Sequence, residues 1–275
     1  METILHNPRL RAVKIPGGLS ACVAAASGKA ESGHGNGDCL VLDLARSFFA
    51  LSDASERHPR ASREFLGRVH AALGSGPGPR DEGSFRGLLD ACYREQPYGR
   101  TATFCGLFVA ESEGAKSALL ACGGDSFLAV LDSLTGEILF RTPADMSFAG
   151  RSLSVGLVTR IPLPTGRERI ILATDGLADL SRVLGLAPQA LCGQYAALHP
   201  PDEAADRLAR FLNRRAGTLH HDDLALIVLD PFALTPFPGP VIYLGGTARS
   251  AERRFRESLP ALPDEWRPLS FQTPS

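Results

Sequence analysis

The chain has 275 residues, of which 44% are hydrophobic and 21% are charged, so one large domain or two small ones are expected and disorder of the whole chain is excluded. Its 29 basic and 30 acidic residues give a net charge of −1, which lacks the basic excess of a general nucleic-acid or membrane-surface binder. No apolar run reaches the roughly 18 residues that a membrane span needs.

The chain begins with short apolar segments that are typical of strands. We expect strands at 20–26, 39–43 and 47–51, because turn-forming residues separate these runs. Basic residues precede the first run, so a signal peptide is the alternative there. The prolines at 8 and 16 in the leader favour a strand instead.

Two amphipathic helices are expected next, at 59–73 and 84–95, with a Gly- and Pro-rich loop between them. In both segments apolar residues recur every three or four positions. Strands then return at 101–110, 117–122, 127–131 and 138–140, and turn residues between the last two favour a hairpin.

The second half of the chain mixes longer helices with two buried strands. The strands are expected at 170–174 and 224–229. A helical region at 180–197 is broken by a proline, and the helix at 201–216 has an acidic start and a basic end that suit its dipole. Several prolines follow residue 230, and a short helix is expected near 248–259.

This order of elements is not the strict alternation of a doubly wound sheet, so an α+β fold with antiparallel sheets covered by helices is favoured. We assign residues 1–18 to an N-terminal extension, 19–230 to the domain and 231–275 to a Pro-containing C-terminal extension. That extension either binds a partner or packs on the domain.

The six cysteines form no Cys-x-x-Cys motif, which favours reduced thiols in the cytoplasm. The arginine-rich, Gly- and Pro-rich composition favours a bacterial source.

Several common enzyme motifs are absent from the sequence. It contains no nucleotide P-loop, no Gly-x-Ser-x-Gly elbow, no His-Glu-x-x-His zinc motif and no Cys-x5-Arg phosphatase loop. His220 and His221 lie beside two aspartates and are either part of a transition-metal site or of a solvated loop. The loop is favoured because no third soft ligand stands at a suitable spacing.

Aspartates stand at the ends of the expected strands. Each alone is typical of a turn, but in a pair of packed sheets such strand ends gather at one edge. Carboxylates so close together repel one another unless cations neutralise them. Oxygen ligands without His or Cys favour magnesium or manganese, and two such ions can activate a water and neutralise a phosphoryl group. The aspartates concerned are Asp38, Asp53, Asp125, Asp175, Asp222 and Asp223.

Between about Leu19 and Asp230 the chain resembles the metal-dependent protein phosphatases, the PPM or type-2C serine/threonine phosphatases, and most closely their bacterial branch. The matching motifs follow one another in family order. They are Asn36-Gly37-Asp38, Phe48 to Asp53, Gly99-Arg100-Thr101-Ala102-Thr103, Gly124-Asp125-Ser126, Ile171 to Asp179, and Asp222 to Leu229.

The resemblance implies a four-layer α-β-β-α sandwich with two central antiparallel sheets. It also implies a catalytic centre of Asp38, Asp53, Asp175 and Asp222 around two manganese or magnesium ions. In this interpretation Asp53 bridges both ions, and Asp175 and Asp222 hold one of them. Asp38, directly or through a water molecule, and the main-chain carbonyl of Ala54 serve the other. Asp125 and Asp179 help to hold a weaker third ion.

Three positions depart from the family pattern. Gly33 stands where many members carry a phosphate-binding arginine, Gly37 where Glu or Gln is commonest, and Ala54 where many members have glycine. In addition, the last motif reads Asp222-Asp223 where the family often has Asp-Asn, and this ending, with the Gly-Asp start, resembles the bacterial branch. The missing arginine leaves His34, Arg57 and Arg60 as candidates for binding the substrate phosphate.

The expected function is therefore a cytoplasmic bacterial phosphatase that acts on phosphoserine or phosphothreonine in a protein and opposes a serine/threonine kinase. A hydroxide that bridges the metals would attack phosphorus in line with the leaving oxygen. No nucleic-acid or membrane partner is expected, and the sequence does not define the oligomeric state. The alternative, motivated by the three departures, is a catalytically inactive phosphatase-like binding module.

Overall fold

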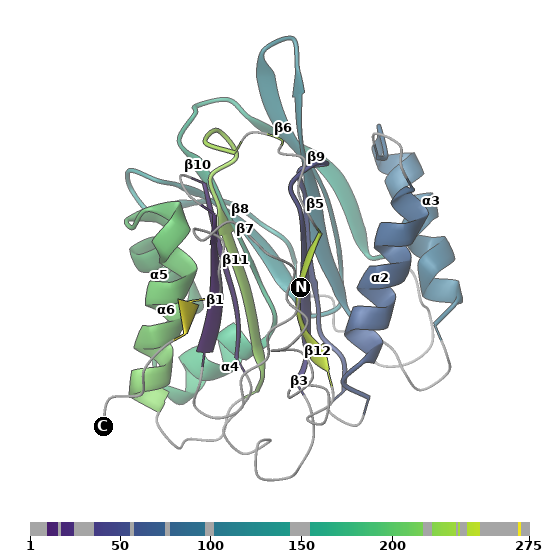
Figure 1. Cartoon of the computed structure of the whole chain (residues 1–275). Coiled ribbons are helices and arrows are strands. Elements are labelled where there is room, and N and C mark those ends of the chain that lie inside the picture. Colours follow the sequence, from purple (N-terminus) through teal and green to yellow (C-terminus); the bar gives the residue numbers. More distant parts are fainter. Residues whose placement is uncertain are drawn as a thin grey trace.

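The computed structural model describes residues 10–15, 18–24, 36–55, 58–74, 78–96, 102–143, 155–216, 222–234, 236, 241–247 and 269–270. These residues form two β-sheets that pack face to face between two helical layers (Figure 1). All strand pairs in both sheets are antiparallel. The four-layer α-β-β-α sandwich expected from the resemblance is confirmed.

The first sheet has seven strands. In spatial order they are β13 (Leu269–Ser270), β1 (Leu10–Ile15), β2 (Leu19–Ala24), β11 (Leu224–Leu229), β10 (Glu168–Ala173), β7 (Phe127–Asp132) and β8 (Ile138–Arg141). The second sheet has six strands. Their spatial order is β12 (Ile242–Thr247), β3 (Asn36–Asp43), β4 (Phe48–Ser52), β5 (Phe104–Ser112), β6 (Ala115–Gly123) and β9 (Leu157–Leu163).

Each sheet is covered by its own helices. The second sheet packs against α2 (Ala61–Leu73) and α3 (Glu82–Arg94), which lie together on one side in Figure 1. The first sheet packs against the remaining helices of the described residues. These are α4 (Gly176–Val183), α5 (Pro188–Leu191), the π-helical turn η2 (Cys192–Ala197) and α6 (Pro201–Ala216). None of these helices is long and apolar enough to cross a membrane.

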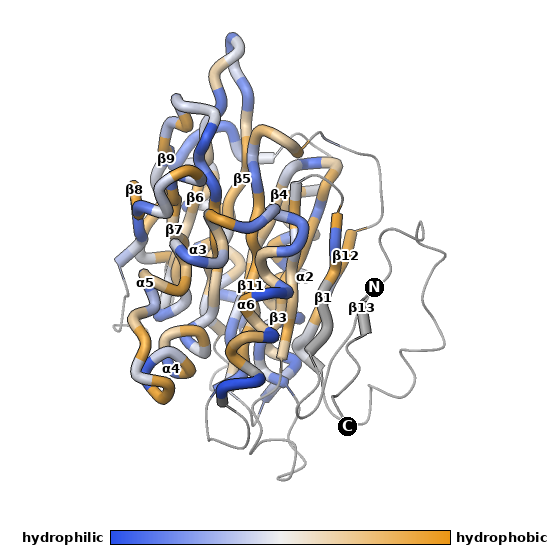
Figure 2. Tube along the Cα trace, turned by 90° about the vertical axis from the view of Figure 1, so that its left-hand side faces the viewer, coloured by the Kyte–Doolittle hydropathy of each residue, from blue (hydrophilic) through white to orange (hydrophobic). Residues whose placement is uncertain are grey.

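The central strands are buried on both faces, which explains why they appear in the sequence as continuous apolar runs. Along β10, Ile170 and Leu172 point into the core between the sheets, whereas Ile171 and Ala173 pack under the helices with Leu208 of α6. Figure 2 shows hydrophobic residues following the strands through the molecule. Side-chain alternation along each strand thus builds three apolar layers in the sandwich.

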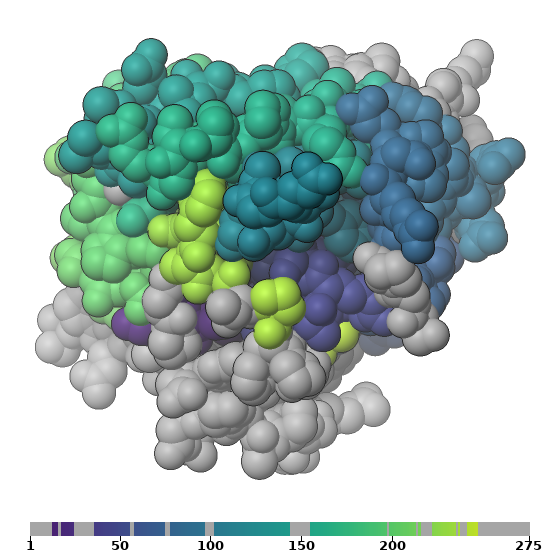
Figure 3. All heavy atoms as spheres, turned by 90° about the horizontal axis from the view of Figure 1, so that it is seen from above, coloured from purple at the N-terminus to yellow at the C-terminus, as the bar shows by residue number. Residues whose placement is uncertain are grey.

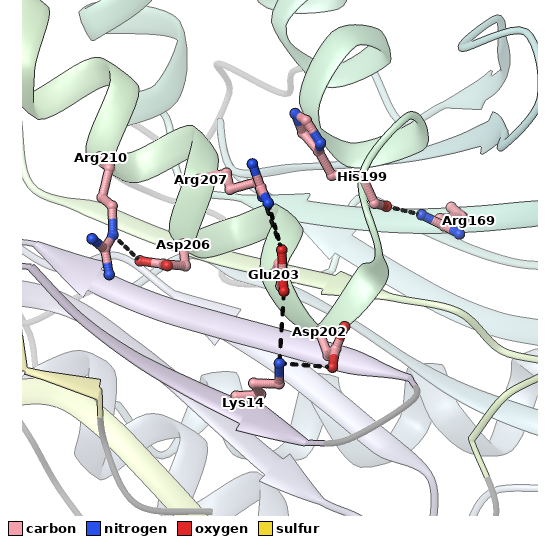
Figure 4. Close-up of polar contacts among 8 residues, drawn as sticks. All are labelled: Lys14, Arg169, His199, Asp202, Glu203, Asp206, Arg207 and Arg210. Atoms are coloured by element: carbon pink, nitrogen blue, oxygen red, sulfur yellow. Dashed lines mark hydrogen bonds and ion pairs between the residues drawn. The ribbon is translucent and has the colours of Figure 1, made fainter. Parts of the chain in front are cut away.

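Helix α6 is tied to the first sheet at its acidic start. The ammonium nitrogen of Lys14 on β1 lies 3.1 Å from a carboxylate oxygen of Asp202 and 3.9 Å from one of Glu203 (Figure 4). Farther along the helix, Arg207 pairs with Glu203 and Arg210 pairs with Asp206. The acidic first turn also complements the positive end of the helix dipole.

One end of the sandwich, seen from above in Figure 3, is closed where the β5–β6 hairpin meets the segment after β11. There the Lys116 ammonium donates to the Pro231 carbonyl at 2.8 Å and lies 5.6 Å from the centre of the Phe232 ring. The aspartates of the sequence motifs lie at the opposite end.

Four strands were not expected from the sequence: β1, β9, β12 and the two-residue β13. β9 contains Pro162, which is tolerated because β9 is an edge strand. β1 and β12 lie outside the 19–230 range assigned to the domain, yet both are hydrogen-bonded into the sheets. β12 ends in a bulge at two glycines, Gly245 and Gly246, which have positive φ and obscure a strand pattern in the sequence.

Other differences concern helix limits. The helical region expected at 180–197 begins earlier, at Gly176, and it is interrupted between Val183 and Pro188, as expected from the proline. Pro188 is the first residue of the helix that follows, a position that suits proline. The helix expected near 248–259 lies outside the described residues.

Candidate metal centre

Strand pairing brings the acidic motifs to one end of the sandwich. Cys39 on β3 pairs with Ser52 on β4. Asp38 and Asp53, which adjoin these two residues in the chain, therefore lie at the same end of the two strands. In the first sheet Ala173 pairs with Phe127, which places Asp175 near the loop before β7. Helix α4, which begins directly after Asp175, lies at this lower end of the molecule in Figure 1.

Three carboxylates converge at this end. Asp53, Asp125 and Asp175 each offer one oxygen, and these oxygens all lie within 4.8 Å of one another. All three side chains are partly buried. An all-oxygen set of this kind suits a hard divalent cation such as magnesium or manganese. The residues present therefore fit the ions that the sequence analysis expected.

Asp38 is buried beside this group. Its Oδ2 accepts a 2.5 Å hydrogen bond from the Thr174 hydroxyl, and that hydroxyl accepts the backbone N–H of Ala225 at 2.8 Å. Burial raises the pKa of Asp38 well above its usual value, and the charges of Asp53 and Asp223 raise it further, while the Thr174 bond lowers it. The pKa of Asp38 is therefore raised first by its burial and second by the negative charges gathered at this end.

The two consecutive aspartates before β11 have different environments. Asp223 is buried, and its Oδ2 accepts the Gly37 N–H at 2.9 Å. Asp222 is partly exposed, and its N–H donates to Asp179 Oδ2 at 3.2 Å. Asp179 also pairs with Arg182 at 2.9 Å. Asp223 thus links the last motif to the first across the two sheets.

The first motif also contacts the loop after β4. A Cβ added to Gly37 would lie 2.0 Å from the carbonyl oxygen of Ala54 and 3.6 Å from an Asp53 carboxylate oxygen. The Ala54 carbonyl therefore occupies the space that any side chain at position 37 would need. The contact accounts for the glycine at position 37, but it involves the main chain of residue 54, which glycine or alanine would present alike.

The candidate phosphate-binding residues are only partly placed. Arg60 is exposed at the start of α2, where its carbonyl accepts the N–H of Glu64. His34 and Arg57 lie outside the described residues, as do Gly33 and the His220-His221 pair.

Four residues that contact the acidic motifs were not assigned roles from the sequence. They are Thr103, Ser126, Thr174 and Asp223. One signal was available for Asp223. Neighbouring residues in extended backbone point to opposite sides, so one member of an Asp-Asp pair entering a buried strand must face inward. Thr103, Ser126 and Thr174 lie within the quoted motifs, but nothing in the sequence indicated which groups their hydroxyls would contact.

No family model matches the sequence, and no curated protein matches it. Solved structures do match the fold. The catalytic domain of the serine/threonine protein phosphatase PstP, solved in complex with two manganese ions, is 17% identical. The match covers 80% of this chain and 98% of that one, with a TM-score of 0.56. The chain has the PP2C phosphatase fold.

Two further PP2C structures support this assignment of the fold. The photosystem II phosphatase PBCP is 20% identical over 77% of this chain and 97% of its own, with a TM-score of 0.56. The structure of the PP2C domain and a regulatory fragment of SpoIIE from Bacillus subtilis is 18% identical. It covers 81% of this chain and 62% of its own, with a TM-score of 0.56. At such identities the likeness concerns the PP2C fold.

Proposed function

We propose that this protein is a metal-dependent phosphatase that hydrolyses phosphoserine or phosphothreonine in a phosphorylated protein substrate. The observation that carries the proposal is the convergence of Asp53, Asp125 and Asp175 at one end of a PP2C fold. Two of these aspartates follow buried strands and the third lies in the turn before β7, so rigid elements hold all three carboxylates in place.

The residues that would hold two manganese or magnesium ions are Asp53 and Asp175 with Asp38, Asp222 and the Ala54 carbonyl. Asp125 and Asp179 would serve a weaker third ion. When bound, such ions lower the pKa of a coordinated water and neutralise charge on a phosphoryl group. The protein's own contribution is to hold the carboxylates. Thr174 fixes one oxygen of Asp38, and Asp223 fixes the Gly37 amide beside it.

Substrate binding and cellular context extend the same proposal. Arg60, together with His34 and Arg57, is the candidate set for binding the substrate phosphate. We propose a bacterial, cytoplasmic protein that opposes a serine/threonine kinase, without a nucleic-acid or membrane partner. We also propose that the domain extends beyond 19–230 to include β1 and β12, because both strands belong to the sheets.

The alternative is an inactive phosphatase-like binding module. The close contact between Gly37 and the Ala54 carbonyl favours the enzyme, because it keeps a candidate ligand oxygen packed between the first motif and Asp53. Asp38, Asp53, Asp175 and Asp222 are also all retained.

Calorimetric titration with manganese separates the two functions. The proposal expects specific binding by the wild type and a large loss of affinity in Asp53→Asn. Asp132→Asn is the matched control, because Asp132 is buried at the far end of β7, where its Oδ1 accepts the turn amides of Leu134 and Thr135 and its Oδ2 pairs with Arg167 at 3.1 Å, so all its partners lie away from the proposed metal centre. Equal affinity in all three proteins, or no binding by any, would favour the binding module.

A further inference from the structure

Two buried hydroxyl groups lie between the loops that carry Asp53 and Asp125. The Thr103 hydroxyl accepts the backbone N–H of Asp53 at 2.8 Å, and it lies 2.9 Å from the Ser126 hydroxyl. Ser126 follows Asp125 directly in the chain. Thr103 is 7% exposed and Ser126 is 0% exposed, so this bond is shielded from water.

Each hydroxyl belongs to a segment that is fixed on its own side. The Thr103 N–H donates to the Asp53 carbonyl at 2.8 Å, so Thr103 bonds both peptide groups that flank the Asp53 side chain. The Ser52 hydroxyl donates to the Thr103 carbonyl at 2.6 Å. On the other side, the Cys122 thiol donates to the Ser126 carbonyl at 3.0 Å.

The Thr103–Ser126 bond is therefore a direct link between two candidate ligand loops. Their carboxylates repel each other when both are charged, so the loops would tend to separate unless a cation or a structural link holds them. Valine and alanine would fill the same space without a hydroxyl. Burying hydroxyl groups is unfavourable unless they are hydrogen-bonded, which argues that the pair does more than pack.

We propose that Thr103 and Ser126 are positioning residues that set the separation of Asp53 and Asp125, and thereby the affinity of the metal centre for divalent cations. This inference rests on the proposed function, since it assumes that these carboxylates bind metal. Neither hydroxyl is assigned to the metal itself. Each acts through the aspartate beside it.

The test is a manganese titration, by calorimetry, of the full chain and its variants. Thr103→Val and Ser126→Ala remove one hydroxyl each, and losing such a supporting contact typically weakens metal binding by about 10–100-fold. Because the two residues share one bond, the double variant should bind about as weakly as the weaker single variant. Thr103→Ser keeps the hydroxyl and should bind close to the wild type.

Ser20→Ala is the matched control. The Ser20 hydroxyl is also buried, accepts the Ala205 N–H at 2.9 Å and donates to the Pro201 carbonyl at 2.5 Å. It pairs with Val228, towards the end of β11 away from Asp223. Ser20→Ala should lower Tm as Ser126→Ala does, but it should leave the manganese affinity unchanged.

The outcomes separate this inference from the proposed function. Wild-type affinity in both Thr103→Val and Ser126→Ala, or losses that add fully in the double variant, would overturn the positioning role while the metal centre stands. If the wild type itself binds no manganese, the proposed function is contradicted and the inference falls with it.

Discussion

Replacing Gly37 by alanine tests how tightly the proposed metal centre is packed. The new Cβ would lie 2.0 Å from the Ala54 carbonyl oxygen, whereas ordinary contact begins near 3.4 Å, so the two segments must separate by about 1.4 Å. Over-packing of this kind costs about 1–3 kcal/mol. For a domain of this size, where 1 kcal/mol shifts Tm by about 2–4 °C, that corresponds to a fall in Tm of about 2–12 °C.

The same displacement should affect metal binding. Metal–ligand distances tolerate only about ±0.2 Å, so a carbonyl that moves by more than an ångström is lost as a ligand. We expect Gly37→Ala to bind manganese at least tenfold more weakly, measured by calorimetry alongside thermal denaturation.

Gly67→Ala provides the control for this substitution. Gly67 lies inside α2, and nothing lies within 4 Å of its added Cβ. Alanine in a helix interior stabilises by about 0.5–1 kcal/mol relative to glycine. The steric reasoning is refuted if Gly37→Ala keeps wild-type Tm and manganese affinity while Gly67→Ala behaves as expected.

Three further predictions concern the same end of the fold and one remote ion pair. Manganese at about 100 times its Kd should stabilise the wild type by about 2.7 kcal/mol in thermal scans. Asp53→Asn should lose most of this added stability. An equal stabilisation of Asp53→Asn by manganese would contradict the assignment of Asp53 as a metal ligand. Gly176→Ala should lower Tm, because its Cβ would lie 1.7 Å from the Asp223 carbonyl; an unchanged Tm would contradict this. Burial raises the pKa of Asp43, but hydrogen bonds from Arg46 and His70 outweigh it and hold the pKa below its usual value. This stabilisation is present above about pH 4 and is lost as the pH falls further, so Asp43→Asn should flatten the acid limb of a denaturation curve. An unchanged limb would contradict the sign.

Much of the fold was predictable because the central strands are buried on both faces. The apolar run from 224 to 229 can be recognised as a strand without knowing which strands pair with it. Once the sheets are taken as antiparallel, the positions of the aspartates next to strand ends predict that they lie close together. The amphipathic helices over both sheets follow from local periodicity in the same way.

The remaining features depend on contacts between distant segments. β12 becomes a strand by pairing with β3, about 200 residues earlier in the chain, and its glycines gave no local signal. The Thr103–Ser126 bond joins two loops. The distance between these loops depends on how the strands pair in the sheet, and the local sequence of each loop does not reveal it. The inward orientation of Asp223, in contrast to Asp222, depends on the Gly37 amide that it meets.

The most direct test of the central claim is phosphate release from a phosphothreonine peptide by the purified full chain. The reaction is run with manganese, with magnesium and with a chelator, beside Asp175→Asn. The account predicts release that requires a divalent ion, stops with the chelator and is nearly abolished in Asp175→Asn. Absence of release with either metal, or equal release by Asp175→Asn, would contradict it.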